Sequence, residues 1–169
     1  MGQPDKAHKF LENAKAAEKT FKSKTELAIA LNNSATIAAR SKNMEAAADL
    51  SLEAVKIMER RMAEFFAEGR HALLAENEEF LKELRVFCVA CINLGSVKER
   101  TQEHAASREM FETAYKYASK YLGKTDRMTA VLKMKVAKIS QRSSPLRGNT
   151  SVQHSSMSRL PRMPSLPQI

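Results

Sequence analysis

The two cysteines of this chain, Cys88 and Cys91, have the Cys-x-x-Cys spacing that supports redox chemistry or supplies half of a zinc site. Their surroundings favour neither use. Val86, Phe87 and Ile92 place the pair inside an apolar helical stretch, with no strand–helix–strand pattern of a thioredoxin site around it. No second cysteine pair exists to complete a zinc site. We therefore interpret both thiols as buried structural groups of a helix.

The remaining residue types with catalytic or metal-binding chemistry are histidines, glutamates and glycines. The four histidines are scattered and show no metal-binding spacing: His8, His71, His104 and His154. Four glutamates cluster beside Lys82 and Arg85, where ion pairs between successive helical turns explain them: Glu76, Glu78, Glu79 and Glu83. The five glycines form no phosphate-binding loop. These observations predict a protein that is not an enzyme and that uses no cofactor or metal.

Positive charge is concentrated at the C-terminal end of the chain. Residues 113–169 hold eleven Lys and Arg against one acid, a net charge of +10, whereas residues 1–112 hold seventeen bases and eighteen acids, a net charge of −1. A basic segment of this kind is attracted to polyanions such as acidic protein surfaces, nucleic acid or anionic lipid. The charge pattern therefore predicts a balanced body followed by a basic binding arm.

Helices are the elements that would position these residues. The composition is rich in Ala, Leu and Met, with no Trp and only five Gly, and therefore favours helix. Asn43 is expected to cap a helix start and Gly123 a helix end. Apolar residues spaced by three and four predict five or six helices, at residues 4–22, 25–39, 44–69, 78–98, 101–123 and 127–139. We expect an all-α fold.

A packing pattern recurs along these helices: a small residue, a large apolar residue four positions on, and an alanine three further on. It occurs three times, with Ser51 as a departure at the middle position: Ala7/Leu11/Ala14, Ala47/Ser51/Ala54 and Ser107/Phe111/Ala114. The preceding helix carries a small residue, Gly95, at the matching offset from Ser107. Small residues let antiparallel helices approach closely, and the large residue, Phe111 in the last unit, is expected to fill the gap between repeats.

This pattern, together with the Leu-Gly pair at residues 94–95, resembles the tetratricopeptide repeat. Residues 27–35 and 121–130 are similar to the kinesin-light-chain type of that repeat. The resemblance implies stacked antiparallel helical hairpins, a tetratricopeptide-like α-solenoid, over residues 1–140. The period is uneven, at 40 residues and then 60, and Lys98 stands where the family has an aromatic residue. An unrelated helical bundle therefore remains an alternative.

The last segment, residues 141–169, differs in character from the rest. It contains four of the five prolines and seven serines, with no acid and no aromatic residue. Such a segment buries too little apolar surface to offset its ordering entropy, so we expect a disordered basic tail. The chain would thus divide into a helical domain, residues 1–140, and this tail.

Two short motifs lie in the predicted tail. Residues 158–161, with the sequence Ser-Arg-Leu-Pro, resemble the ligands of microtubule end-binding proteins. Residues 162–167 have an Arg-x-x-Ser-x-Pro form in which Ser165, once phosphorylated, would suit a phosphoserine reader of the 14-3-3 type. A solvated end without a partner is the alternative for the whole tail.

The function that best fits the helical body and the basic tail is that of a protein-interaction scaffold or adaptor. Its basic arm would dock to an acidic partner such as a tubulin tail. The residues expected to contact that partner are Lys133, Lys135, Lys138, Arg142, Arg147, Ser158, Arg159, Leu160, Pro161, Arg162 and Ser165. The alternative is a microtubule-associated, cytoskeletal or axonemal assembly component. A nucleic-acid-binding adaptor comes third, because aromatic residues are not interleaved with the tail's charges.

The expected location follows from two absences in the sequence. No apolar run is long enough to cross a membrane, and residues 1–6 lack the apolar core of a signal peptide. We therefore expect a cytoplasmic protein without a membrane span, at the cytoskeleton or cilium if the microtubule interpretation holds.

Overall fold

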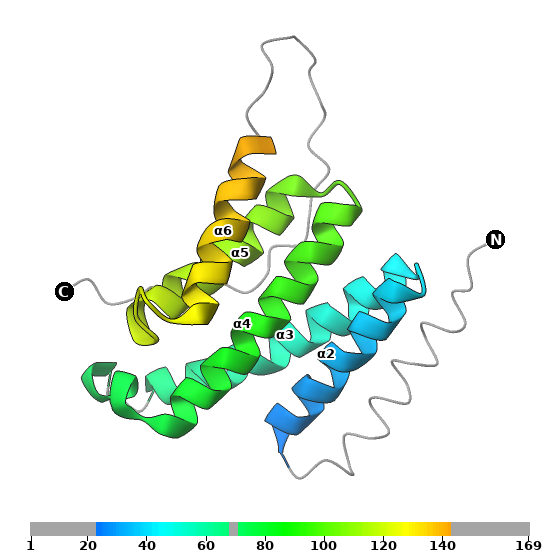
Figure 1. Cartoon of the computed structure of the whole chain (residues 1–169). Helices are drawn as coiled ribbons and strands as arrows, with labels where there is room; N and C mark the ends of the chain where they lie inside the picture. Colours follow the sequence, from blue (N-terminus) through cyan, green and yellow to red (C-terminus); the bar gives the residue numbers. More distant parts are fainter. Residues whose placement is uncertain (1–22, 68–70, 143–169) are drawn as a thin grey trace.

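The computed structural model describes residues 23–67 and 71–142 of the chain, and these residues contain helices and turns but no strand (Figure 1). The elements are α2 (Lys24–Arg40), α3 (Met44–Ala67), the 3-10 helix η1 (His71–Glu76), α4 (Glu78–Arg100), α5 (His104–Tyr121) and α6 (Arg127–Arg142). The expected all-α class is confirmed for this part of the chain. The expected bounds of these five α-helices are right to within three residues at each end. The helix predicted at residues 4–22 lies outside the described residues.

Side-chain caps fix where α2, α3 and α4 begin. The Asn43 carboxamide oxygen accepts the backbone N–H of Ala46 at 3.1 Å, as predicted, and Asn77 caps α4 in the same way through Phe80 at 2.9 Å. Gly123 follows α5 with φ +88, which confirms the predicted helix end, because this left-handed backbone region suits glycine. Local hydrogen-bonding chemistry therefore sets most helix ends.

The prediction that a helix starts at Thr101 is wrong. The Thr101 N–H donates to the Val97 carbonyl at 3.0 Å, so this residue ends α4 instead. Gln102 then takes φ 64, and the Glu103 N–H donates back to the Lys98 carbonyl at 2.9 Å. Such a turn satisfies carbonyl groups at the C-terminus of α4. It occupies residues 101–103, so α5 begins only after them.

The turn between α2 and α3 has the same hydrogen bonds as the turn between α4 and α5. Residues 41, 42 and 43 donate to the carbonyls of residues 37, 39 and 38, and residues 101, 102 and 103 donate to those of residues 97, 99 and 98. Lys42 adopts φ 60, close to the φ 64 of Gln102. The two helix pairs are therefore joined by turns of one geometry, spaced 60 residues apart.

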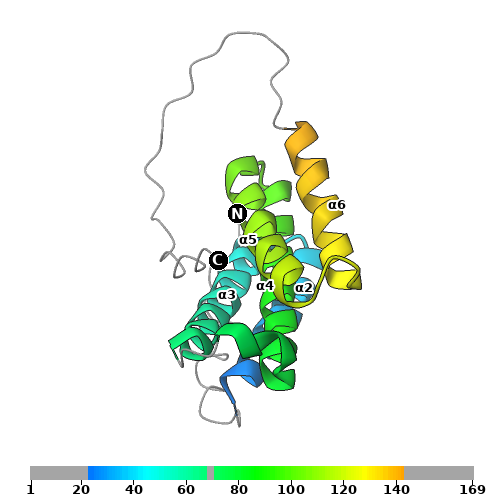
Figure 2. The ribbon, with the colours of Figure 1, turned by 90° about the vertical axis from the view of Figure 1, so that its left-hand side faces the viewer.

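Each helix packs against the next one along the chain, and α4 occupies the middle of the molecule (Figures 1 and 2). Helix α4 contacts α2, α3, η1, α5 and α6. Helix α6 packs mainly on α5 and stands at one side of the molecule, where Figure 2 shows it beyond α5. The last described helix thus has neighbours on one side only.

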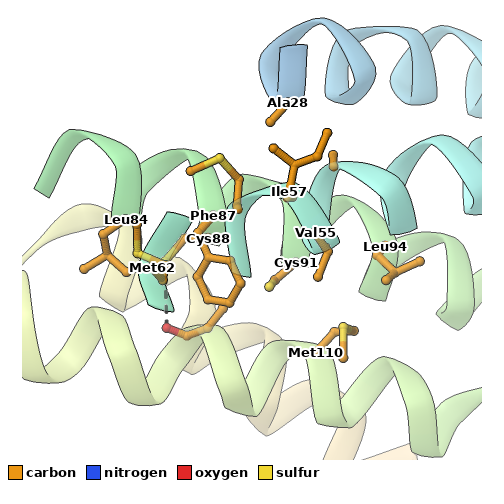
Figure 3. Packing of buried hydrophobic residues seen from close by; sticks show 14 of the residues in the cluster. Ala28, Val55, Ile57, Met62, Leu84, Phe87, Cys88, Cys91, Leu94 and Met110 are labelled. Carbon is orange, nitrogen blue, oxygen red and sulfur yellow. Dashed lines mark hydrogen bonds between the residues drawn. The ribbon is translucent and has the colours of Figure 1, made fainter. Parts of the chain in front are cut away.

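The core is continuous across α2, α3, α4 and α5 (Figure 3). Aromatic rings from α3, α4 and α5 fill one end of it. Phe80 meets Tyr121 edge-on at a centroid distance of 5.0 Å, and Phe66 lies 5.8 Å from Tyr117. Edge-to-face and offset ring contacts of this kind add to the stabilisation from apolar burial.

Helices α4 and α5 approach closely at Gly95. The Ser107 hydroxyl donates to the Gly95 carbonyl at 2.7 Å, and a Cβ atom on Gly95 would lie 2.6 Å from the ring of Phe111. The Phe111 side chain is fully buried, and Lys135 of α6 lies over its ring at 5.4 Å from the centroid. Phe111 therefore fills the space between α4 and α5 under Lys135 of α6, and its role between repeats stays a prediction.

At the equivalent position of α3, Ser51 replaces the large residue, and the space is not filled. A cavity of about 150 Å³ lies there between α2 and α4, lined at its base by Ser51, Ala35 and Val97. The Ser51 hydroxyl is fully buried and has no hydrogen-bond partner among the described residues. The departure from the packing pattern at Ser51 thus has a direct consequence in the fold.

We predict that Gly95→Ala lowers the free energy of unfolding by about 1–3 kcal/mol, because the new methyl group overpacks against Phe111. This loss should exceed the gain of up to about 1 kcal/mol that alanine brings to a helix interior. Urea unfolding of the full chain measures the effect. In a Phe111→Leu background the same substitution should cost less, since the ring it clashes with is gone. Equal unfolding midpoints for Gly95→Ala and the parent would contradict the close approach.

Candidate interaction surfaces

Cys88 and Cys91 lie in the core and not in a reactive site (Figure 3). Both side chains are buried, and the Cys88 thiol donates to the Ala114 carbonyl at 3.8 Å. Burial raises the pKa of Cys88 to about 12 and that of Cys91 well above its usual value. A thiol that stays protonated is a poor nucleophile and metal ligand. The interpretation of this pair as structural is confirmed.

Charged side chains at the start of α2 form a long-range network with α3 and α4. Arg61 donates to both carboxylate oxygens of Glu83, at 2.9 and 2.8 Å, and also to Glu64, which pairs with Lys24 at 3.2 Å. Nearby side chains line a cavity of about 470 Å³. The Glu83 pairing was expected within α4, but its partner comes from α3, because only the fold brings the two helices together.

Arg85, also expected to pair within its own helix, reaches the loop before α6. Its guanidinium donates to Asp126 at 3.0 Å and holds the pKa of that carboxyl below its usual value. The other Asp126 oxygen accepts the Met128 N–H at 2.8 Å at the start of α6. This single acid of the basic C-terminal region therefore helps to position α6 and is not available to a partner.

The structure divides the predicted binding lysines of α6 into two groups. Lys135 donates to the Ser96 hydroxyl at 3.3 Å and covers Phe111, and Lys138 lies 3.5 Å from the Glu99 carboxylate. These two cations contact the body of the molecule, and their assignment as partner contacts stays a prediction. Lys133 is exposed and has no ion pair within the described residues. It is the lysine of the three that is open to a partner.

The other predicted contacts cannot be placed. The side chain of Arg142, at the end of α6, lies outside the described part of the structure. So do the remaining residues of the predicted arm: Arg147, Ser158, Arg159, Leu160, Pro161, Arg162 and Ser165.

Helix α6 has a buried face and an outer face of different composition. Leu132 and Ile139 are fully buried on the inner face. On the outer face, Met134 is 73 % exposed and Val131 is 38 % exposed, and Ala130 is exposed beside them. The sequence did not predict this combination of apolar and basic side chains: a methionine at helical spacing favours a place in the core, and for Met134 that expectation is wrong.

Two arginines add positive charge at the cavity between α2 and α4. Arg40 and Arg100 line its rim, both exposed, and neither forms an ion pair with a carboxylate in the described residues. Lys135 reaches the Ser96 hydroxyl at the same cavity. This side of the molecule therefore carries cations that the body does not fully neutralise.

Glu59 is a partly buried carboxyl group on α3. Burial raises its pKa to about 7, Lys56 opposes the shift, and Glu109 of α5 adds to it. One of its oxygens is buried without a hydrogen-bond partner. Because the folded protein favours the protonated form, this group makes stability depend on pH.

Comparison with known proteins found no matching family model, no similar curated protein and no similar solved structure. Within residues 23–67 and 71–142, no three His, Cys, Asp or Glu side chains are grouped to hold a metal ion. In the same ranges no helix is both long and apolar enough to span a membrane. The surfaces described above therefore carry the argument for function.

We predict that both cysteines resist thiol reagents in the folded protein. With 5,5′-dithiobis(2-nitrobenzoate) near neutral pH, the native chain should release almost no thiolate, because both groups are buried and protonated. The same sample in denaturant should titrate both thiols, which serves as the control. Rapid reaction of the native protein would show that the pair is accessible.

We predict that Glu59→Gln stabilises the protein above neutral pH and has little effect at acidic pH. The raised pKa means that the stability contribution of the protonated carboxyl is fully present below about pH 4.5 and is lost as pH rises through about 7. The free energy of unfolding at pH 8 should rise by about 1–2 kcal/mol. This is less than the full pKa shift would give, because solvent still reaches the group. Thermal unfolding at pH 5 and pH 8 measures it. A gain of equal size at both values would contradict the shift.

Proposed function

We propose that this protein is a non-enzymatic interaction scaffold that docks to an acidic protein surface through α6 and the basic segment after it. The observation that carries the proposal is the outer face of α6, where exposed Lys133 and Arg127 flank exposed apolar residues. The helix leads directly into residues 143–169, which contain three arginines and no acid. Cations without nearby carboxylates attract acidic partners and speed their encounter.

The body of this scaffold would be a short solenoid of helical hairpins. Two features support that arrangement: the turns of identical geometry at residues 41–43 and 101–103, and the packing of α2 on α4 and of α4 on α6. Stacked hairpins present an extended surface and need no catalytic centre. The resemblance to tetratricopeptide repeats is consistent with such a role.

A microtubule-associated role is the second candidate, because residues 158–161 resemble ligands of end-binding proteins and tubulin tails are acidic. That role would place the protein at the cytoskeleton or cilium. Phosphorylation of Ser165 would add negative charge to the basic arm. A phosphoserine-binding protein that recognises this residue would then regulate either function. Nucleic acid is less favoured, since Tyr117 and Tyr121 are buried in the core and cannot stack on bases.

We predict that the full chain binds labelled poly-L-glutamate and that affinity falls at least about tenfold between about 50 and 300 mM salt, because exposed charges are screened. Fluorescence anisotropy measures the binding. Replacing Arg147, Arg159 and Arg162 by Gln should weaken it at low salt while leaving thermal unfolding unchanged. The double substitution Leu160→Asn and Pro161→Asn is the charge-matched control for poly-L-glutamate and should bind as the parent does.

The same double variant tests the microtubule alternative. It should lose binding to an end-binding protein if residues 158–161 are the ligand, whereas the triple Arg→Gln variant alters mainly charge. Absence of any salt-dependent binding to poly-L-glutamate would refute the docking proposal.

A further inference from the structure

The outer face of α6 carries a packing pattern that is buried on α3 and α5. On α5 the small–large–small spacing of four and three residues is fully buried at Ser107, Phe111 and Ala114, and the equivalent positions of α3, where Ser51 stands at the centre, are fully buried too: Ala47, Ser51 and Ala54. Helix α6 repeats the spacing with Ala130, Met134 and Ala137, and all three are exposed. Met134, at the central position that Phe111 fills on α5, is 73 % exposed.

We propose that this stripe of α6 is the docking site for an acidic amphipathic helix of a partner protein. The inference rests on the proposed function and names the surface and the kind of partner. Alanines at positions 130 and 137 allow a second helix to approach, as Gly95 and Ser107 do between α4 and α5. Met134 between them is a flexible apolar side chain that adapts to the facing groove.

The charges beside the stripe determine which kind of partner helix can bind there. Lys133 lies on one side of the stripe and Arg127 on the other, and neither forms an ion pair in the part of the chain that the structure describes. A partner helix with Asp or Glu flanking an apolar stripe would therefore bury Met134 and pair with both cations. Complementary charge along the edges of a helix pair also fixes its orientation and register.

The chain's own segments are poor occupants of this site. Residues 143–169 carry three arginines and no acid, so the stripe's cations repel them. Residues 1–22 carry five lysines against three acids, and they join the molecule at α2, which packs on α3 and α4. A second copy docked face to face would bring Lys133 and Arg127 of both chains together. Like charges in that position disfavour the dimer.

The test uses the full chain and a labelled synthetic helical peptide with a Leu/Ala stripe flanked by Glu, measured by fluorescence anisotropy. Met134→Gln should weaken binding about tenfold at every salt concentration, because it removes apolar burial without changing charge. Lys133→Gln should weaken binding mainly at low salt. Ile37→Gln is the matched control: Ile37 is similarly exposed, at 61 %, but lies on α2, and its replacement should leave binding unchanged.

The outcomes separate this inference from the proposed function. If poly-L-glutamate binds as well as the amphipathic peptide and Met134→Gln has no effect, the docking site on α6 is refuted while electrostatic docking stands. If neither acidic probe binds, both proposals fail. If analytical ultracentrifugation shows a dimer that Met134→Gln abolishes, the occupant is a second copy and the acidic partner is refuted.

Discussion

The close approach of α4 and α5 at Gly95 is the contact on which the rest of this structure depends. Only a residue without a side chain leaves room for the Phe111 ring, and the Ser107 hydroxyl satisfies the Gly95 carbonyl in the same gap. Helix α4 also contacts α2, α3 and α6. Its position relative to α5 therefore determines where the other helices pack. The buried ring in turn supports α6, because Lys135 lies across it.

The same packing geometry, with different side chains, gives different results along the chain. On α5 the large central residue fills the space, whereas on α3 Ser51 leaves a cavity that two unpaired arginines border. On α6 the central Met134 faces outward. A helix face with this pattern is therefore buried, lines a cavity or stays exposed, depending on which element packs opposite it. That difference is why the outer face of α6 is the strongest candidate for a partner.

Among the described residues, the thiols and several of the charged groups stabilise the fold. The thiols are protonated in the core, and Arg61, Glu83, Arg85 and Asp126 join helices to one another. Charge pairs of this kind, partly shielded from water, hold elements in register, but partners have little access to them. The unpaired cations of the described residues include Lys133 and Arg127 of α6 and the two arginines of the cavity between α2 and α4, which favours an acidic partner over a substrate.

The sequence by itself determined the helices, the cap at Asn43 and the turn at Gly123, because these depend on local backbone chemistry and on apolar residues at helical spacing. It also showed that charge gathers at the C-terminal end. Only the tertiary structure decided that Lys135 and Lys138 serve the body while Lys133 stays open, that Glu83 pairs with Arg61, and that the stripe around Met134 is uncovered. Periodicity defines the faces of a helix, but the neighbour that covers each face comes from distant parts of the chain.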